Sequence, residues 1–123
     1  MYYFKLFKRL TNNTQTAIMS VMSAKQNITA ILYDKKGRIL SVGKNSYIKT
    51  HPLQAKSAHA VGEDHKIYLH AEIDALVKAK NWNKAYKLVI TRFSKDGSPA
   101  LAKPCKVCQH AIKLAGIKQI EHT

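Results

Sequence analysis

Apolar side chains recur at helical spacing in the first 25 residues of the chain. Tyr3, Leu6, Phe7 and Leu10 lie three or four positions apart, and residues 14–25 repeat the pattern. Residues at this spacing share one helix face, so the segment predicts two amphipathic helices. We expect them to pack against the domain's own sheet. Because basic residues flank the first apolar stripe, a helix lying on a membrane or a nucleic acid is the alternative.

Beyond residue 27 the pattern becomes that of strands. Residues 28–33 are largely β-branched or apolar, residues 34–37 have turn chemistry, and residues 39–42 are again mostly apolar. This order predicts a β-hairpin. Residues 43–68 are polar with little periodicity, which predicts a long loop that can hold a short helical turn. Loops of this length in small domains are often functional.

Helices and strands alternate in the second half of the chain. The pattern predicts a helix over 69–80, a strand over 86–92, a helix over 105–114 closed by Gly116, and a strand over 118–121. Such alternation favours a parallel pair of strands. No repeat or linker divides the sequence, so we expect one domain over 1–123, with a helical segment at 1–25 and a core at 27–123.

The charge is strongly one-sided. Lysine and arginine number 21 against 7 acidic residues, which gives a net charge of +14 and a sequence pI near 9.9. A surface of this kind attracts phosphate-bearing substrates or partners, nucleic acid included. No stretch has the length of a membrane span or the composition of a secretion signal, so we expect a cytoplasmic protein without a membrane partner.

Two short motifs carry the candidate chemistry. Cys105 and Cys108 follow Pro104 at a predicted helix start, where the helix dipole favours their thiolate forms and their spacing places both on one side. His70 at another helix start offers a third ligand, which predicts one zinc ion per chain with an open fourth position. Glu72, two positions after His70, suits a general acid and base acting on the water that zinc activates.

Other uses of a C-x-x-C pair lead to different functions. A redox pair of the thioredoxin type needs no partner motif such as His70-Ala-Glu72. A structural zinc site needs a fourth protein ligand, for which His59, His65 and His110 are the candidates.

The pair H-A-E and P-C-x-x-C resembles the signature of the cytidine and deoxycytidylate deaminase superfamily. The resemblance runs from the hairpin to the last strand and implies a three-layer α/β/α fold. In that fold a central mixed sheet carries an N-terminal hairpin and a parallel element, with helices on both faces. It also implies zinc held by His70, Cys105 and Cys108, proton transfer by Glu72, sugar contact by Asn45, and base recognition beside Ala71.

Some features depart from the family pattern. Residues 94–103 form a longer connection than is common before P-C, and Ala102-Lys103 replaces the usual residues there. The sequence also ends at Thr123, directly after the expected last strand, where many relatives continue. We therefore expect the N-terminal helices or a partner subunit to complete the pocket, and we predict a homo-oligomer.

The implied reaction is hydrolytic deamination of cytosine or adenine. We expect a cytosine nucleoside or nucleotide as substrate, with Lys44, Lys49 or Lys103 as candidate phosphate ligands. A base in single-stranded DNA or RNA is the alternative substrate, because the basic surface suits a polynucleotide. A third hypothesis is a zinc-stabilised nucleic-acid-binding module without catalysis, against which Glu72 argues.

Overall fold

The computed structural model describes residues 28–123, and the two helices predicted within 1–25 lie outside this range. The described part contains four strands and three helices. They are, in chain order, β1 (Ile28–Tyr33), β2 (Ile39–Lys44), α3 (Pro52–Ala60), α4 (Ala71–Ala79), β3 (Lys87–Arg92), α5 (Lys106–Ala115) and β4 (Gln119–His122). Each strand and helix predicted from residue 28 onward is present, with ends shifted by one or two residues.

One mixed sheet of order β2-β1-β3-β4 organises the domain. Strand β1 pairs antiparallel with both β2 and β3, and β3 pairs parallel with β4. The β1–β2 hairpin turns at residues 34–38, where Asp34 O accepts a hydrogen bond from Gly37 N at 3.1 Å. The predicted hairpin, the parallel element and the mixed α/β sheet are therefore confirmed.

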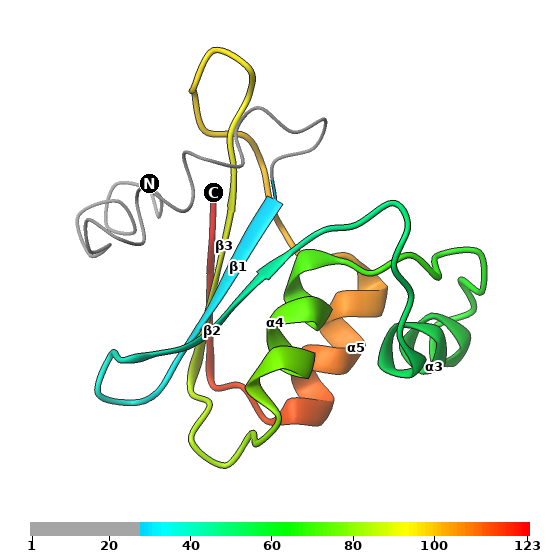
Figure 1. Ribbon diagram of the computed structural model, residues 1–123, viewed down its shortest axis with the longest axis horizontal. Helices are drawn as coiled ribbons and strands as arrows, with labels where there is room; N and C mark the ends of the chain where they lie inside the picture. Colours follow the sequence, from blue (N-terminus) through cyan, green and yellow to red (C-terminus); the bar gives the residue numbers. More distant parts are fainter. Residues whose placement is uncertain (1–27) are drawn as a thin grey trace.

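The two faces of the sheet differ in what covers them. Ala30 and Leu32 of β1 point toward the side occupied by α3, α4 and α5, where the main hydrophobic core lies (Figure 1). Ile31 and Tyr33 alternate onto the opposite face and join a second buried cluster with β3 residues. All three described helices thus cover one face of the sheet, and residues 28–123 contain no helix on the other face.

The segment predicted as a long loop contains a nine-residue helix, α3. Pro52 occupies its first turn, and the ring of His51 accepts a hydrogen bond from Leu53 N at 3.0 Å. Its buried positions carry Gln54, Ser57 and Ala58, which are polar or small. Because no apolar stripe marks the helix, periodicity could not reveal it.

Strand β2 and helix α4 make an unusually close approach at Gly43. A Cβ atom added there would overlap Ala71 O and Ala75 N. Next to it, Ser41 Oγ donates to Ala75 O at 2.6 Å, and Lys44 N donates to Asp74 Oδ2 at 2.9 Å. These contacts fix the first turn of α4 on the sheet.

No helix within residues 28–123 has both the length and the apolar character needed to cross a lipid bilayer.

Candidate active site

The two sequence motifs lie at the starts of two helices. His70 is the N-cap residue of α4, and Cys105 is the N-cap residue of α5. An N-cap side chain commonly accepts a hydrogen bond from its own helix, but neither of these does so. Their side chains are instead turned toward each other and toward Cys108 in the first turn of α5.

The three side chains form a compact cluster. His70 Nδ1 lies 3.2 Å from Cys108 Sγ and 3.5 Å from Cys105 Sγ, and all three atoms lie within 4.8 Å of one another. Zn–N bonds of about 2.0 Å and Zn–S bonds of about 2.3 Å in a tetrahedron place such ligand atoms roughly 3.5–3.8 Å apart. The cluster therefore fits one zinc ion.

The chain supplies three ligands to this site. Among residues 28–123 no fourth His, Cys, Asp or Glu joins the cluster, and residues 1–27 contain none of these residue types. The fourth ligands considered for a structural site, His59, His65 and His110, all lie outside the cluster. A three-ligand zinc site leaves a position for water, as catalytic zinc sites do.

The electrostatics of the thiols favour a cation between them. The pKa of Cys105 is lowered to about 3, chiefly by a hydrogen bond from Cys108 and in addition by His70, against the opposing effect of burial. The same hydrogen bond and burial raise the pKa of Cys108 far above its usual value. One thiolate forms without help, and a second in this buried space requires a positive charge such as that of a metal ion.

Glu72 lies in the first turn of α4 and is 6% exposed. Burial raises the pKa of its carboxyl group above the usual value, while a backbone hydrogen bond and His70 oppose this shift. Its side chain also lies within hydrogen-bonding reach of Cys108. A carboxyl group in this position can hold or release a proton beside the zinc ligands.

A cavity of about 350 Å³ opens onto the cluster. His70, Glu72 and Cys105 line one part of it, and both Asn45 and Ala71 line it as well. The structure thus brings the six residues singled out from the sequence to one place, with Cys108 buried behind Cys105.

Basic residues also border this cavity. Lys103 lines it, as expected for a candidate phosphate ligand, and so does Lys66, which the sequence reasoning did not select. The other two candidates, Lys44 and Lys49, are not among the lining residues. Lys66 lies inside the segment predicted as an irregular loop, where no periodicity distinguished it from its neighbours.

Gln54 is a positioning residue that sequence reasoning missed. It is fully buried in α3, where its Oε1 accepts from His70 N at 3.1 Å and its Nε2 donates to Lys66 O at 2.8 Å. One side chain therefore holds the backbone of a zinc ligand and of a residue lining the cavity. The only local signal was a glutamine two positions after Pro52, which is too common to predict this role.

The fold and the zinc cluster together define a zinc-dependent deaminase domain. The sequence profile of the cytidine and deoxycytidylate deaminase zinc-binding region matches residues 6–122, and the chain belongs to this family. A comparison with curated proteins gave no match. The family supports a hydrolytic cytosine deaminase, and the cluster of His70, Cys105 and Cys108 supports one zinc ion.

Proposed function

We propose that the protein deaminates the cytosine of a nucleoside or nucleotide to uracil, with consumption of water and release of ammonia. The observation that carries this proposal is the buried carboxyl group of Glu72 on the wall of the same cavity as His70 and Cys105. At about 350 Å³ the cavity falls within the range of small-molecule sites.

Each residue takes a defined part in the proposed reaction. Zinc, when bound by His70, Cys105 and Cys108, supplies the Lewis acidity that makes water nucleophilic at neutral pH. Glu72 accepts a proton from the attacking water and delivers protons to the ring and to the departing amino group, which leaves as ammonia. Both transfers need a carboxyl group that cycles between its two protonation states, which its buried position favours.

The remaining wall of the cavity binds the substrate. The backbone at Ala71 reads the edge of the base, and the side chain of Asn45 contacts the sugar. Lys66 and Lys103 lie where they can bind a phosphate group, which favours a nucleotide over a nucleoside.

A polynucleotide substrate is the second candidate, and a specific feature favours it. Tyr47 and Tyr68 line the cavity and are 52% and 50% exposed. Exposed aromatic rings beside lysines can stack bases that flank the target in a single strand. In this case the target base would be flipped into the cavity.

A substrate panel tests both candidates. We expect a mass increase of about one dalton per deamination for cytidine, deoxycytidine or their monophosphates. Adenosine and single-stranded oligonucleotides complete the panel. Conversion of oligonucleotides alone would reject the first candidate, and conversion of adenosine alone would reject cytosine as the target base.

The role of Glu72 has its own test. Glu72→Gln should retain zinc and lose about 10²–10⁴-fold in rate, while Asp96→Asn in the exposed turn after β3 should leave the rate unchanged. Unchanged function in Glu72→Ala would instead support a non-catalytic zinc module. Two sequence predictions stay proposals: a homo-oligomer, which size-exclusion chromatography tests, and a cytoplasmic location.

A further inference from the structure

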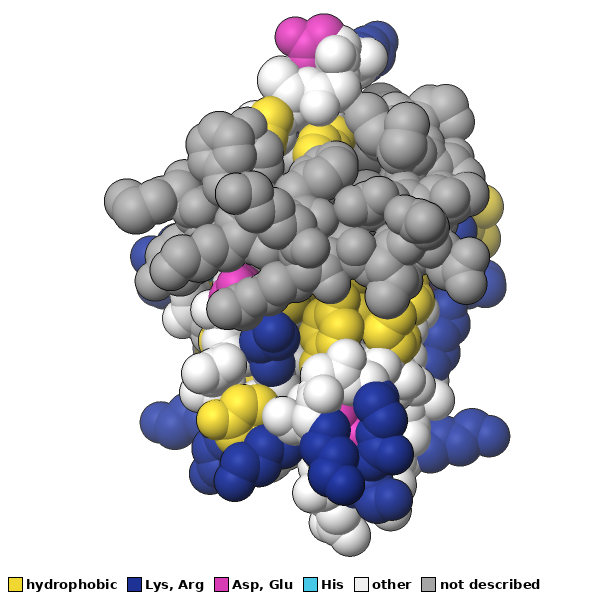
Figure 2. All heavy atoms as spheres, turned by 90° about the vertical axis from the view of Figure 1, so that its left-hand side faces the viewer, with side chains coloured by type: hydrophobic (Ala, Val, Ile, Leu, Met, Phe, Trp, Pro, Cys, Tyr) yellow, Lys and Arg dark blue, Asp and Glu magenta, His cyan; other side chains and the backbone are white. Residues whose placement is uncertain are grey.

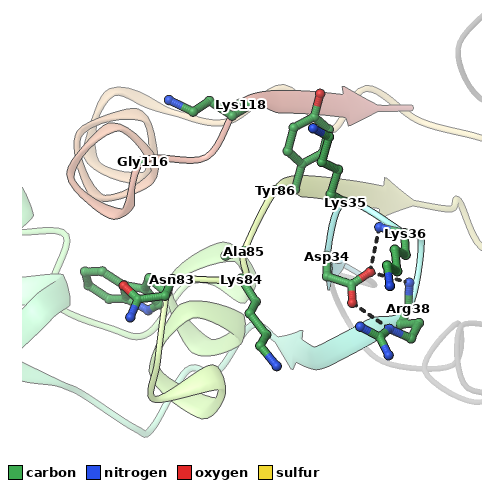
Figure 3. A pocket seen from close by; sticks show the side chains of 11 residues that line it. Asp34, Lys35, Lys36, Arg38, Asn83, Lys84, Ala85, Tyr86, Gly116 and Lys118 are labelled. Carbon is green, nitrogen blue, oxygen red and sulfur yellow. Dashed lines mark hydrogen bonds and ion pairs between the residues drawn. The ribbon is translucent and has the colours of Figure 1, made fainter.

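A second cavity lies at the end of the sheet away from the candidate active site. It has a volume of about 500 Å³ and is formed by three segments: the β1–β2 turn, the connection before β3 and the α5–β4 connection (Figure 3). The candidate active site borders Ile28, the first residue of β1, whereas this cavity borders Asp34, directly after its last residue. A six-residue strand spans roughly 20 Å, so the two sites are separate.

Basic side chains surround this cavity. Figure 3 shows Lys35, Lys36 and Arg38 on the hairpin side, Lys84 on the side of the connection before β3, and Lys118 after α5. All five side chains are exposed at the rim. Lys and Arg side chains also gather at the lower end of the face in Figure 2, the level of the β1–β2 turn in Figure 1.

Among the ion pairs described within residues 28–123, none includes the four lysines of this rim. The only acidic residue at the cavity, Asp34, is held by Arg38 Nε at 2.7 Å and by the backbone of the hairpin turn. All seven acidic residues of the chain lie within 28–123, and the ion pairs described there join five of them to residues other than Lys35, Lys36, Lys84 and Lys118. Four like charges around one hollow repel one another, and a bound anion relieves this repulsion.

Two aromatic side chains also line the cavity. Trp82 and Tyr86 are half-buried there, and Trp82 Nε1 donates to Leu76 O at 2.9 Å, which fixes the indole ring. Single-strand-binding proteins hold a nucleic acid with basic side chains and aromatic rings in one groove, and both kinds of side chain line this cavity. The lysines are spread over three segments around an open rim rather than converging on one point, which suits successive phosphates of a strand.

We propose that this cavity, the basic cavity, binds the sugar–phosphate backbone of a single-stranded nucleic acid, with a base lying against Trp82 or Tyr86. The site is independent of the chemistry at His70 and Glu72. It would hold a strand to the protein whether the deaminated base is part of that strand or of a free nucleotide.

A binding measurement without deamination tests the proposal. The probe is a fluorescent oligothymidylate of roughly 15 nucleotides, which contains no cytosine or adenine, and the readout is the anisotropy of its label on the zinc-loaded full chain. We expect Lys84→Ala combined with Lys118→Ala to weaken binding about tenfold at low salt. Loss of two phosphate contacts should also reduce the slope of log affinity against log salt by about 1.4, at about 0.7 per contact.

A matched control separates the basic cavity from the general charge of the protein. Lys56→Ala combined with Lys95→Ala removes the same two charges from exposed positions outside both cavities, and we expect near-normal binding. Equal weakening by the two pairs would overturn the proposal, because it would mean that net charge alone binds the strand. All these substitutions are at exposed lysines, and an unchanged melting temperature and zinc content would verify the fold.

A competitor distinguishes a strand from a free nucleotide. Thymidine triphosphate should displace the oligonucleotide only weakly at equal phosphate concentration, because it spans fewer lysines. Full displacement at that concentration would overturn the proposal in favour of a nucleotide pocket. Failure of the oligonucleotide to bind would leave the deaminase proposal intact, and absence of deamination would leave this one intact.

Discussion

Adding one methyl group at Gly43 should disturb the candidate active site through the start of helix α4, without touching the side chains of His70, Glu72, Cys105 or Cys108. Gly43 lies in β2 against the first turns of α4, and its φ angle is not in the left-handed region. A substitution there is therefore opposed by contacts and not by backbone strain. An added Cβ would overlap Ala71 O and Ala75 N and would lie 2.9 Å from Ala75 Cα.

The size of the effect follows from these contacts. Nonbonded carbon atoms approach to about 3.5–4.0 Å, so α4 must retreat from β2 by at least roughly 0.6 Å. The atoms in the way are backbone, which cannot rotate aside as a side chain can. Overpacking of a core costs about 1–3 kcal/mol of folding stability. We expect Gly43→Ala to lower the free energy of unfolding by about 3 kcal/mol. Helix α4 carries Glu72 and begins directly after His70, and displacements of about 1 Å can cost 10²-fold in rate.

The matched control is Gly37→Ala in the same hairpin. Gly37 has a φ of 85° and no atom within 4 Å of an added Cβ, so its cost comes from left-handed backbone, about 1–2 kcal/mol. Chemical denaturation should therefore give both variants a lower free energy of unfolding than the wild type, with the lowest value for Gly43→Ala. Deamination measured well below both melting temperatures should fall at least tenfold in Gly43→Ala and stay normal in Gly37→Ala. A wild-type rate in Gly43→Ala, or an equal loss in both, would refute the positioning role.

Three further changes probe the zinc site and the hairpin turn. Gln54→Leu should cost about 1–3 kcal/mol and lower the zinc affinity measured by chelator competition, since it frees the backbone of His70; normal affinity would argue against a positioning role. Cys105→Ser should lose the one zinc per chain detected by elemental analysis, and a metal-free protein with full activity would contradict the mechanism. The backbone hydrogen bond from Arg38 lowers the pKa of Asp34 in the folded protein. The ionised carboxylate therefore stabilises the fold fully when the pH is above the ordinary pKa of aspartate. This stabilisation is lost as the pH falls through the lowered pKa. Asp34→Asn should therefore have a lower melting temperature than the wild type at neutral pH, and the difference in melting temperature should shrink in acid. A difference that stays constant with pH would contradict this linkage.

The cluster of candidate zinc ligands could be predicted from the sequence because each motif is local. Cys105 and Cys108 are three positions apart on one helix start, and His70 and Glu72 are two positions apart on another. The helix-start pattern places each pair correctly without knowledge of the rest of the fold. Joining the pairs required only that the two helices lie side by side, which the α/β alternation implied.

Helix α3 and the role of Gln54 could not be predicted from the sequence in this way. Its buried positions are polar or small, so hydrophobic periodicity is absent. The function of Gln54 depends on His70, 16 residues away, and on Lys66, 12 residues away. Neither distance has a sequence signature, because both arise when the segment after β2 folds back over the start of α4.

The sequence gives the net charge of the chain, but only the structure shows where the charged side chains lie. The chain has 21 basic and 7 acidic residues. An excess of this size is also compatible with a uniformly basic surface. The structure shows that an acid at the basic cavity, Asp34, is already engaged by Arg38, while Lys84 and Lys118 approach the same hollow from segments more than 30 residues apart in sequence. Part of the excess therefore gathers around one cavity at one end of the sheet. This placement, and not the total charge, makes a nucleic acid site testable by comparing the loss of two lysines at the cavity with the loss of two lysines elsewhere.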